Sequence, residues 1–213
     1  MLAAVILAAG LSSRMGGRPK GLLRFDDRDT FVTRIVRTFN EAGVGDVVVV
    51  TGHQAAAVES VVQESGFRAR CVRNASFEQG QFSSLLAGLA AVAQPGVEGA
   101  LVSLVDAPLF SAATVRALLA HFARTQAPVV RPVRGAEHGH PVLLARALFE
   151  TIRRADPSAG AKPVVRAHAS PEGDLTVDDP GAFADIDTPE DYARLPELVR
   201  RCRRESSTPD VVD

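Results

Sequence analysis

The chain has 213 residues, of which 46 % are hydrophobic, and it carries 24 Lys and Arg against 25 Asp and Glu. This composition is typical of a globular protein and argues against a disordered chain. The net charge of −1 provides no global field that would attract nucleic acid or an anionic membrane, so we expect neither as a partner. Any phosphate site must therefore arise from local geometry.

Cysteines and apolar runs limit the cellular setting. Cys71 and Cys202 are far apart, which argues against a disulfide framework and against a zinc site. The apolar N-terminal run follows no basic region and is too short for a signal peptide, and no stretch approaches the ~18 apolar residues of a membrane span. We therefore expect a soluble, reduced, cytoplasmic protein.

Strand-like and helix-like segments alternate along the chain. We expect strands over 2–8, 46–51, 70–72, 100–105 and 129–133, and helices over 55–65, 83–93, 111–123 and from Phe31, with Thr30 as its N-cap and Gly43 as its stop. The strands are continuous apolar runs, which predicts a three-layer α/β fold: a mostly parallel sheet with helices on both faces. We expect a single domain over 1–198 and a flexible tail over 199–213.

A small, basic loop follows the first strand. The sequence Ala8-Ala9-Gly10 lets a ligand approach the backbone, and the N–H groups of residues 10–13 can surround anionic oxygens. Arg14 and Lys20 add donors suited to phosphate. The loop contains neither a Walker A motif nor G-x-G-x-x-G, so it is a phosphate site of another kind, or a mobile loop with incidental charges.

Acidic residues occur at two further positions. Asp106 follows the strand at 100–105, where it could hold Mg²⁺ or serve only as a turn residue before Pro108. Asp185 and Asp187 are expected on one side of a strand end, where a cation would relieve their repulsion. We expect Asp187 to be the second metal ligand, with Asp185 in support. Thr188 is expected to cap a short helix.

These motifs together resemble the nucleotidyltransferases of the molybdenum-cofactor type. The matching motifs are LAAG-x-S-x-R-M-G…PK at the first loop, Asp106-Ala-Pro, and D-x-D-T-P-E-D from Asp185, and the resemblance covers about residues 2–195. It implies a Rossmann-like nucleotidyltransferase fold. It also implies that the nucleotide triphosphate is bound by Leu7, Ala8, Ala9, Gly10, Ser12, Arg14 and Lys20.

Two other segments gain a role from the resemblance. It implies that Gly139, His140 and Pro141 line the pocket of the acceptor substrate, although a polar hairpin loop explains the same residues. It also implies that Gly80, Ser83 and Ser84 lie near the base and ribose, although Ser83 could equally be a helix cap. Gly21 departs from the family pattern, where Gln or Ala is commoner after Pro-Lys.

The expected chemistry is transfer of a nucleotidyl group. Arg14, Lys20 and Asp106 would be the catalytic residues, with Mg²⁺ on Asp106 and Asp187. No general base is needed, because an attacking phosphate is already an anion near neutral pH. Cytidylyl members of the family read LAAG and guanylyl members LAGG, so the resemblance implies CTP rather than GTP, with molybdopterin as acceptor and a molybdoenzyme as recipient.

Three alternatives remain open. A guanylyltransferase for the same cofactor, or a nucleotidyltransferase for another phosphorylated molecule such as a sugar 1-phosphate, would use the same residues. A non-catalytic, cofactor-handling protein would bind nucleotide without turnover. A dehydrogenase is disfavoured by the missing G-x-G-x-x-G motif.

Overall fold

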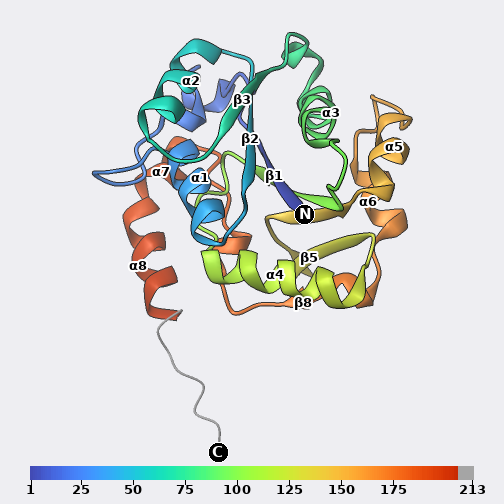
Figure 1. The fold of residues 1–213 in the computed structure, drawn as a ribbon. Helices are drawn as coiled ribbons and strands as arrows, with labels where there is room; N and C mark the ends of the chain where they lie inside the picture. The colour runs from blue at the N-terminus through green and yellow to red at the C-terminus, as the bar shows by residue number, and fades with distance from the viewer. Residues whose placement is uncertain (206–213) are drawn as a thin grey trace, which may run out of the picture.

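A mixed sheet forms the centre of the molecule in the computed structural model, which describes residues 1–205 (Figure 1). Its strands are β1 Leu2–Leu7, β2 Asp46–Thr51, β3 Arg70–Arg73, β4 Gly99–Leu104, β5 Val129–Arg134, β6 Glu137–His138, β7 Val142–Ala145 and β8 Asp174–Thr176. The order is β3-β2-β1-β4-β7-β5-β6, and β8 pairs with β5. Because β1, β2, β3 and β4 run parallel, their carboxyl ends meet at one edge of the sheet.

Helices cover both faces of this sheet, so the expected three-layer α/β fold with a mostly parallel sheet is confirmed (Figure 1). The helices are α1 Phe31–Glu41, α2 Ala55–Glu64, α3 Gln81–Val92, α4 Ala112–Thr125, α5 Ala147–Arg153, α6 Lys162–His168, α7 Pro189–Ala193 and α8 Leu195–Glu205. Strand β7 was not expected: it lies between β4 and β5 and is antiparallel to both.

Each central strand is apolar throughout because each of its two sides meets a helical layer. Within β1, Ile6 joins the core that includes α1 and α4, whereas Val5 joins the core that includes α3 and α5. Helix α3 packs so closely on β1 that a Cβ at Gly88 would lie 2.3 Å from Cγ1 of Val5. Gly88 is therefore the residue that permits this spacing.

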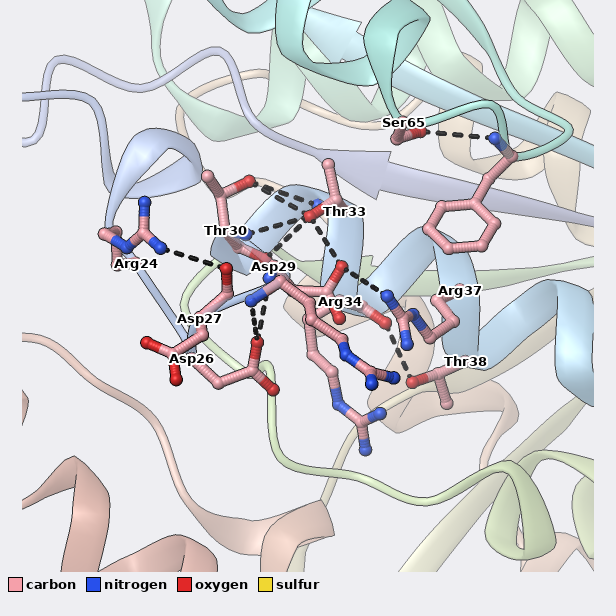
Figure 2. A network of polar contacts seen from close by, with 12 residues as sticks. Arg24, Asp26, Asp27, Asp29, Thr30, Thr33, Arg34, Arg37, Thr38 and Ser65 are labelled. Carbon is pink, nitrogen blue, oxygen red and sulfur yellow. Dashed lines mark hydrogen bonds and ion pairs between the residues drawn. The ribbon is translucent and has the colours of Figure 1, made fainter.

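A polar network fixes the chain just before α1 (Figure 2). Thr30 caps α1 and forms a capping box with Thr33, while the buried Asp29 accepts hydrogen bonds from Thr33 Oγ1 and Arg37 Nη2, both at 3.1 Å. Partial burial would raise the pKa of Asp26, but its carboxylate accepts backbone hydrogen bonds that outweigh this effect and lower the pKa. The turn at residues 24–30 is thereby held against α1.

The expected start of the tail at residue 199 is corrected by α8, which continues to Glu205. The reason is packing: Leu198, Val199 and Cys202 lie against the apolar core. Residues 206–213 of the expected tail lie outside the described part of the chain. Within residues 1–205, no helix is long and apolar enough to cross a membrane.

Candidate active site

A cleft of about 350 Å³ lies at the carboxyl ends of β1 and β4. It brings together most of the expected site residues: Leu7, Ala8, Ala9, Gly10, Ser12, Arg14, Lys20, Gly80, Ser84, Asp106 and Asp187. Sequence reasoning did not identify Leu11, Phe77, Glu78, Gln81, Leu104 and Val105, which also line it. Their signal was proximity in sequence, since each lies within two positions of an expected site residue or in the segment 74–84.

The loop after β1 presents unused donors to this cleft. Ser12 adopts the left-handed conformation with φ 50°, which is uncommon outside glycine and is found at functional sites. Its side chain accepts a hydrogen bond from the backbone N–H of Lys20 at 3.0 Å, which closes the loop. Among the described atoms of residues 1–205, which do not include the Ser13 side chain, the backbone N–H groups of Gly10, Leu11 and Ser12 donate no hydrogen bond. This arrangement suits an anionic ligand.

Lys20 lies between two carboxylates that, like it, line the cleft. Its Nζ is 2.9 Å from Oδ2 of Asp106 and 2.5 Å from Oδ1 of Asp187, and only 11 % of its side chain is exposed. Burial would lower the pKa of Lys20, but the hydrogen bonds to Asp187 and Asp106 outweigh burial and raise the pKa. Arg14 also reaches Asp187, at 3.5 Å, but its side chain is 71 % exposed, so this pair contributes little stability.

Backbone contacts hold the two carboxylates together. The N–H of Ile186 donates to the carbonyl of Asp106 at 2.8 Å, and the Ile186 side chain is fully buried. Asp187 is followed directly by α7, where Thr188 and Asp191 form a capping box, and Asp191 Oδ2 also accepts from the N–H of Asp187. The expected N-cap of this helix at Thr188 is confirmed. The expected strand end is wrong, because residues 184–187 pair with no strand and are anchored by Ile186 instead.

The donor set fits one hard divalent cation held partly by substrate. Within residues 1–205, no three His, Cys, Asp or Glu side chains group as a metal site would require. Mg²⁺, however, is commonly bound by one or two carboxylates together with substrate phosphates and water. Asp106 Oδ1 is buried and accepts no hydrogen bond within the described residues, so it is an oxygen with a free ligand position.

Asp185 and His140 interact electrostatically with Asp106 and with each other. Partial burial raises the pKa of Asp185, with repulsion from Asp106 and Asp187 adding to the rise and His140 and Lys20 opposing it. Burial also lowers the pKa of His140, against the attraction of Asp185 and Asp106. The imidazole is therefore neutral near pH 7. His140 is not among the residues that line the cleft, so its expected contact with substrate stays a prediction.

The segment at 74–84 forms a second wall. Asn74 is buried and donates to Ser83 Oγ at 2.8 Å and to Ser84 Oγ at 3.0 Å. Ser83 also contacts the carbonyl of Gly80 and does not line the cleft, whereas Ser84 and Gly80 do. Ser83 therefore stabilises the N-terminus of α3 and does not face the cleft.

Residues 4–172 match the family described as MobA-like NTP transferase domain. The chain belongs to this family and is a nucleotidyltransferase.

Among curated relatives, nicotine blue oxidoreductase of Paenarthrobacter nicotinovorans is 32 % identical over 90 % of this chain and 94 % of its own length. A molybdenum cofactor guanylyltransferase of Shewanella halifaxensis is 25 % identical over 92 % of this chain and 94 % of its own. The chain matches only 19 % of the bifunctional IPC transferase and DIPP synthase of Thermococcus kodakarensis, at 41 % identity over 38 % of this chain.

Solved structures support the same fold. A nucleotidyl transferase from Methanothermobacter thermautotroptrophicus superimposes with a TM-score of 0.77 at 27 % identity, over 94 % of this chain and 99 % of that chain. Rv0371C from Mycobacterium tuberculosis H37Rv, solved as a complex with manganese, has a TM-score of 0.73 at 28 % identity, over 92 % and 97 % of the two chains.

Proposed function

We propose that this nucleotidyltransferase transfers CMP from CTP to the phosphate of molybdopterin and releases pyrophosphate. The observation that carries the proposal is the cleft in which an anion-binding loop meets two carboxylates around one cation, Lys20. The choice of CTP rests on Ala9, because the resembling cytidylyl enzymes read LAAG at this position. Molybdopterin is supported by the guanylyltransferase relative, which is named for the same cofactor.

In this proposal, the protein's own residues position and neutralise the reactants. The free N–H groups of residues 10–12 hold the triphosphate, and Arg14 and Lys20 offset the negative charge that grows on the leaving group. An oxygen of the acceptor phosphate forms a bond to the α-phosphorus, the bond from that phosphorus to the bridging oxygen breaks, and pyrophosphate leaves with the electron pair.

A divalent cation completes the site. Asp106 and Asp187 would hold Mg²⁺, and the manganese complex of Rv0371C is consistent with such a metal in this fold. When bound, the ion neutralises phosphate oxygens and orients them for displacement. We place the reaction in the cytoplasm, with a molybdoenzyme receiving the product, as further parts of the proposal.

Pyrophosphate release tests the proposal. Purified protein with Mg²⁺ is assayed against CTP, GTP, ATP and UTP, each with molybdopterin or a sugar 1-phosphate. We expect release with CTP and molybdopterin, and loss of release in Asp106→Ala. A preference for GTP would favour a guanylyltransferase for the same cofactor. A preference for a sugar 1-phosphate would favour a nucleotidyltransferase that acts on another phosphorylated molecule. Tight CTP binding without release under any acceptor would favour a cofactor-handling protein.

Hydride transfer is the second activity to assay, because a full-length relative is named an oxidoreductase. The loop after β1 lacks G-x-G-x-x-G, the motif typical of dinucleotide binding, which disfavours this activity. Oxidation of NADH or NADPH with a small aromatic acceptor, at a rate that Asp106→Ala leaves unchanged, would support the oxidoreductase and contradict our proposal.

A further inference from the structure

Tyr192 joins the two segments that carry Lys20 and Asp187. Its phenol donates a hydrogen bond to the backbone carbonyl of Arg24 at 3.0 Å, across 168 positions of sequence. Its ring also packs edge-on against Phe31 at the start of α1, with centroids 5.9 Å apart and planes at 67°. The side chain thus makes two contacts of different chemistry with one neighbouring segment.

On the side of α7, Tyr192 is rigidly linked to Asp187. Thr188 and Asp191 bond reciprocally across the first turn of α7, and Asp191 Oδ2 also accepts from the N–H of Asp187 at 3.2 Å. The N–H of Tyr192 donates to the carbonyl of Thr188 at 3.0 Å. These hydrogen bonds therefore tie Asp187 to the first turn of α7.

On the other side, the carbonyl of Arg24 is linked to Lys20. The N–H of Leu23 donates to the carbonyl of Lys20 at 3.0 Å, and the carbonyl of Leu23 accepts from the N–H of Phe31 at 2.9 Å. An isolated antiparallel bridge joins Arg24 to Thr30, and Figure 2 shows these residues beside the start of α1. Leu23 is buried, so the turn that bears Lys20 is fixed to the same frame.

We propose that Tyr192 is a positioning residue, whose hydroxyl sets the placement of the Lys20 ammonium relative to Asp187 in the reacting complex. The inference rests on the proposed roles of Lys20 and Asp187. Tyr192 does not line the cleft, so it acts through these residues and does not touch substrate. Misplacement of a charge by a fraction of an ångström matters most where that charge stabilises the transition state.

The test is Tyr192→Phe, which keeps the ring on Phe31 and removes only the hydroxyl. Loss of one hydrogen bond predicts a decrease in kcat of about threefold to tenfold. The KM for CTP should stay within about twofold, because the loop N–H groups that bind phosphate are unaltered. Ser65→Ala is the matched control: it also removes a hydroxyl donor to a carbonyl, that of Val62 at 2.6 Å, away from the cleft.

A second readout does not depend on turnover. The chain has two lysines, Lys20 and Lys162, so lysine labelled with ¹⁵N at Nζ gives two NMR signals, and Lys162→Arg assigns them. At fixed pH, Tyr192→Phe should shift the Lys20 signal and leave the Lys162 signal in place, whereas Ser65→Ala should move neither.

Equal kcat and equal Lys20 signals in Tyr192→Phe and Ser65→Ala would overturn the inference, as would a loss of activity that appears entirely in KM. If the unaltered protein transfers no nucleotide, the proposed function fails separately. The NMR comparison then still decides whether Tyr192 positions Lys20.

Discussion

Replacing Lys20 by methionine removes the cation between Asp106 and Asp187 while keeping a side chain of similar length. Two hydrogen bonds to charged groups are lost, at 2.9 and 2.5 Å. Such bonds are each worth about 1.5–3 kcal/mol. Because 44 % of the Asp187 side chain is exposed, solvent screening reduces that value, and we expect the free energy of unfolding to fall by about 1–3 kcal/mol. This corresponds to a decrease in Tm of roughly 2–10 °C for a chain of this size.

The same substitution should expose the cation site. In the unliganded protein a divalent ion must displace Lys20 from the carboxylates, so Mg²⁺ should barely change the Tm. In Lys20→Met the carboxylate of Asp106 loses its cation and Asp187 keeps only the exposed Arg14, so Mg²⁺ at about one hundred times its Kd would add about 2.7 kcal/mol by mass action. Thermal unfolding by circular dichroism, in chelator and in Mg²⁺ without nucleotide, measures both effects.

Lys162→Met is the control for this experiment, since it removes the same charge from an exposed position. This explanation is refuted if Lys20→Met is as stable as this control, or if Mg²⁺ stabilises both variants equally.

A pH series tests the direction in which the charge of Lys20 changes the free energy of unfolding. Because the pKa of Lys20 is raised above 10.5 by folding, its contribution is complete below pH 10.5 and is lost as the pH rises through the folded pKa.

Three further outcomes are expected from packing and burial. Gly88→Ala should lower the free energy of unfolding by about 1–3 kcal/mol, because the new methyl group meets Cγ1 of Val5. In a double-mutant cycle, adding Val5→Ala should recover part of that loss, so that the two effects are not additive. Strict additivity would contradict this packing. Gly21→Ala should be neutral or stabilising by up to ~1 kcal/mol in denaturant unfolding, since its Cβ would make ordinary contacts of 3.5 Å or more. In a Cys202→Ser background, iodoacetamide should alkylate Cys71 far more slowly than a free thiol at pH 8. The reason is that burial, with a smaller contribution from the negative charge of Glu59, raises the pKa of Cys71 to about 11. Rapid alkylation of the folded protein would contradict this.

The fold could be predicted where the signal was local. The strands β1, β2 and β4 are continuous apolar runs because both of their faces meet helices, and Thr30 caps α1 as expected. The position of strand β7 within the sheet could not be predicted from the sequence. Its position between β4 and β5 is a non-local choice that the short run at 142–145 does not encode by itself.

The candidate site, like the fold, could be predicted only where the signal in the sequence was local. The loop at 10–20 and Asp106 follow strand ends, so their meeting at one edge of the sheet could be expected from topology. The sequence predicted Lys20 as a phosphate ligand but gave no sign that it pairs with Asp187, which is 167 positions away. The strand end expected at Asp185 and Asp187 is absent, because one buried side chain, Ile186, and one hydrogen bond from its N–H to the carbonyl of Asp106 anchor that segment without a partner strand.

The most direct measurement of the central claim is a competition between nucleotides. Protein, Mg²⁺ and molybdopterin are incubated with equal CTP and GTP, and the dinucleotide product is identified by mass spectrometry. We expect the cytosine dinucleotide from the unaltered protein and no product from Asp106→Ala. A guanine dinucleotide would contradict the role assigned to Ala9, and no dinucleotide of either kind would contradict molybdopterin as the acceptor.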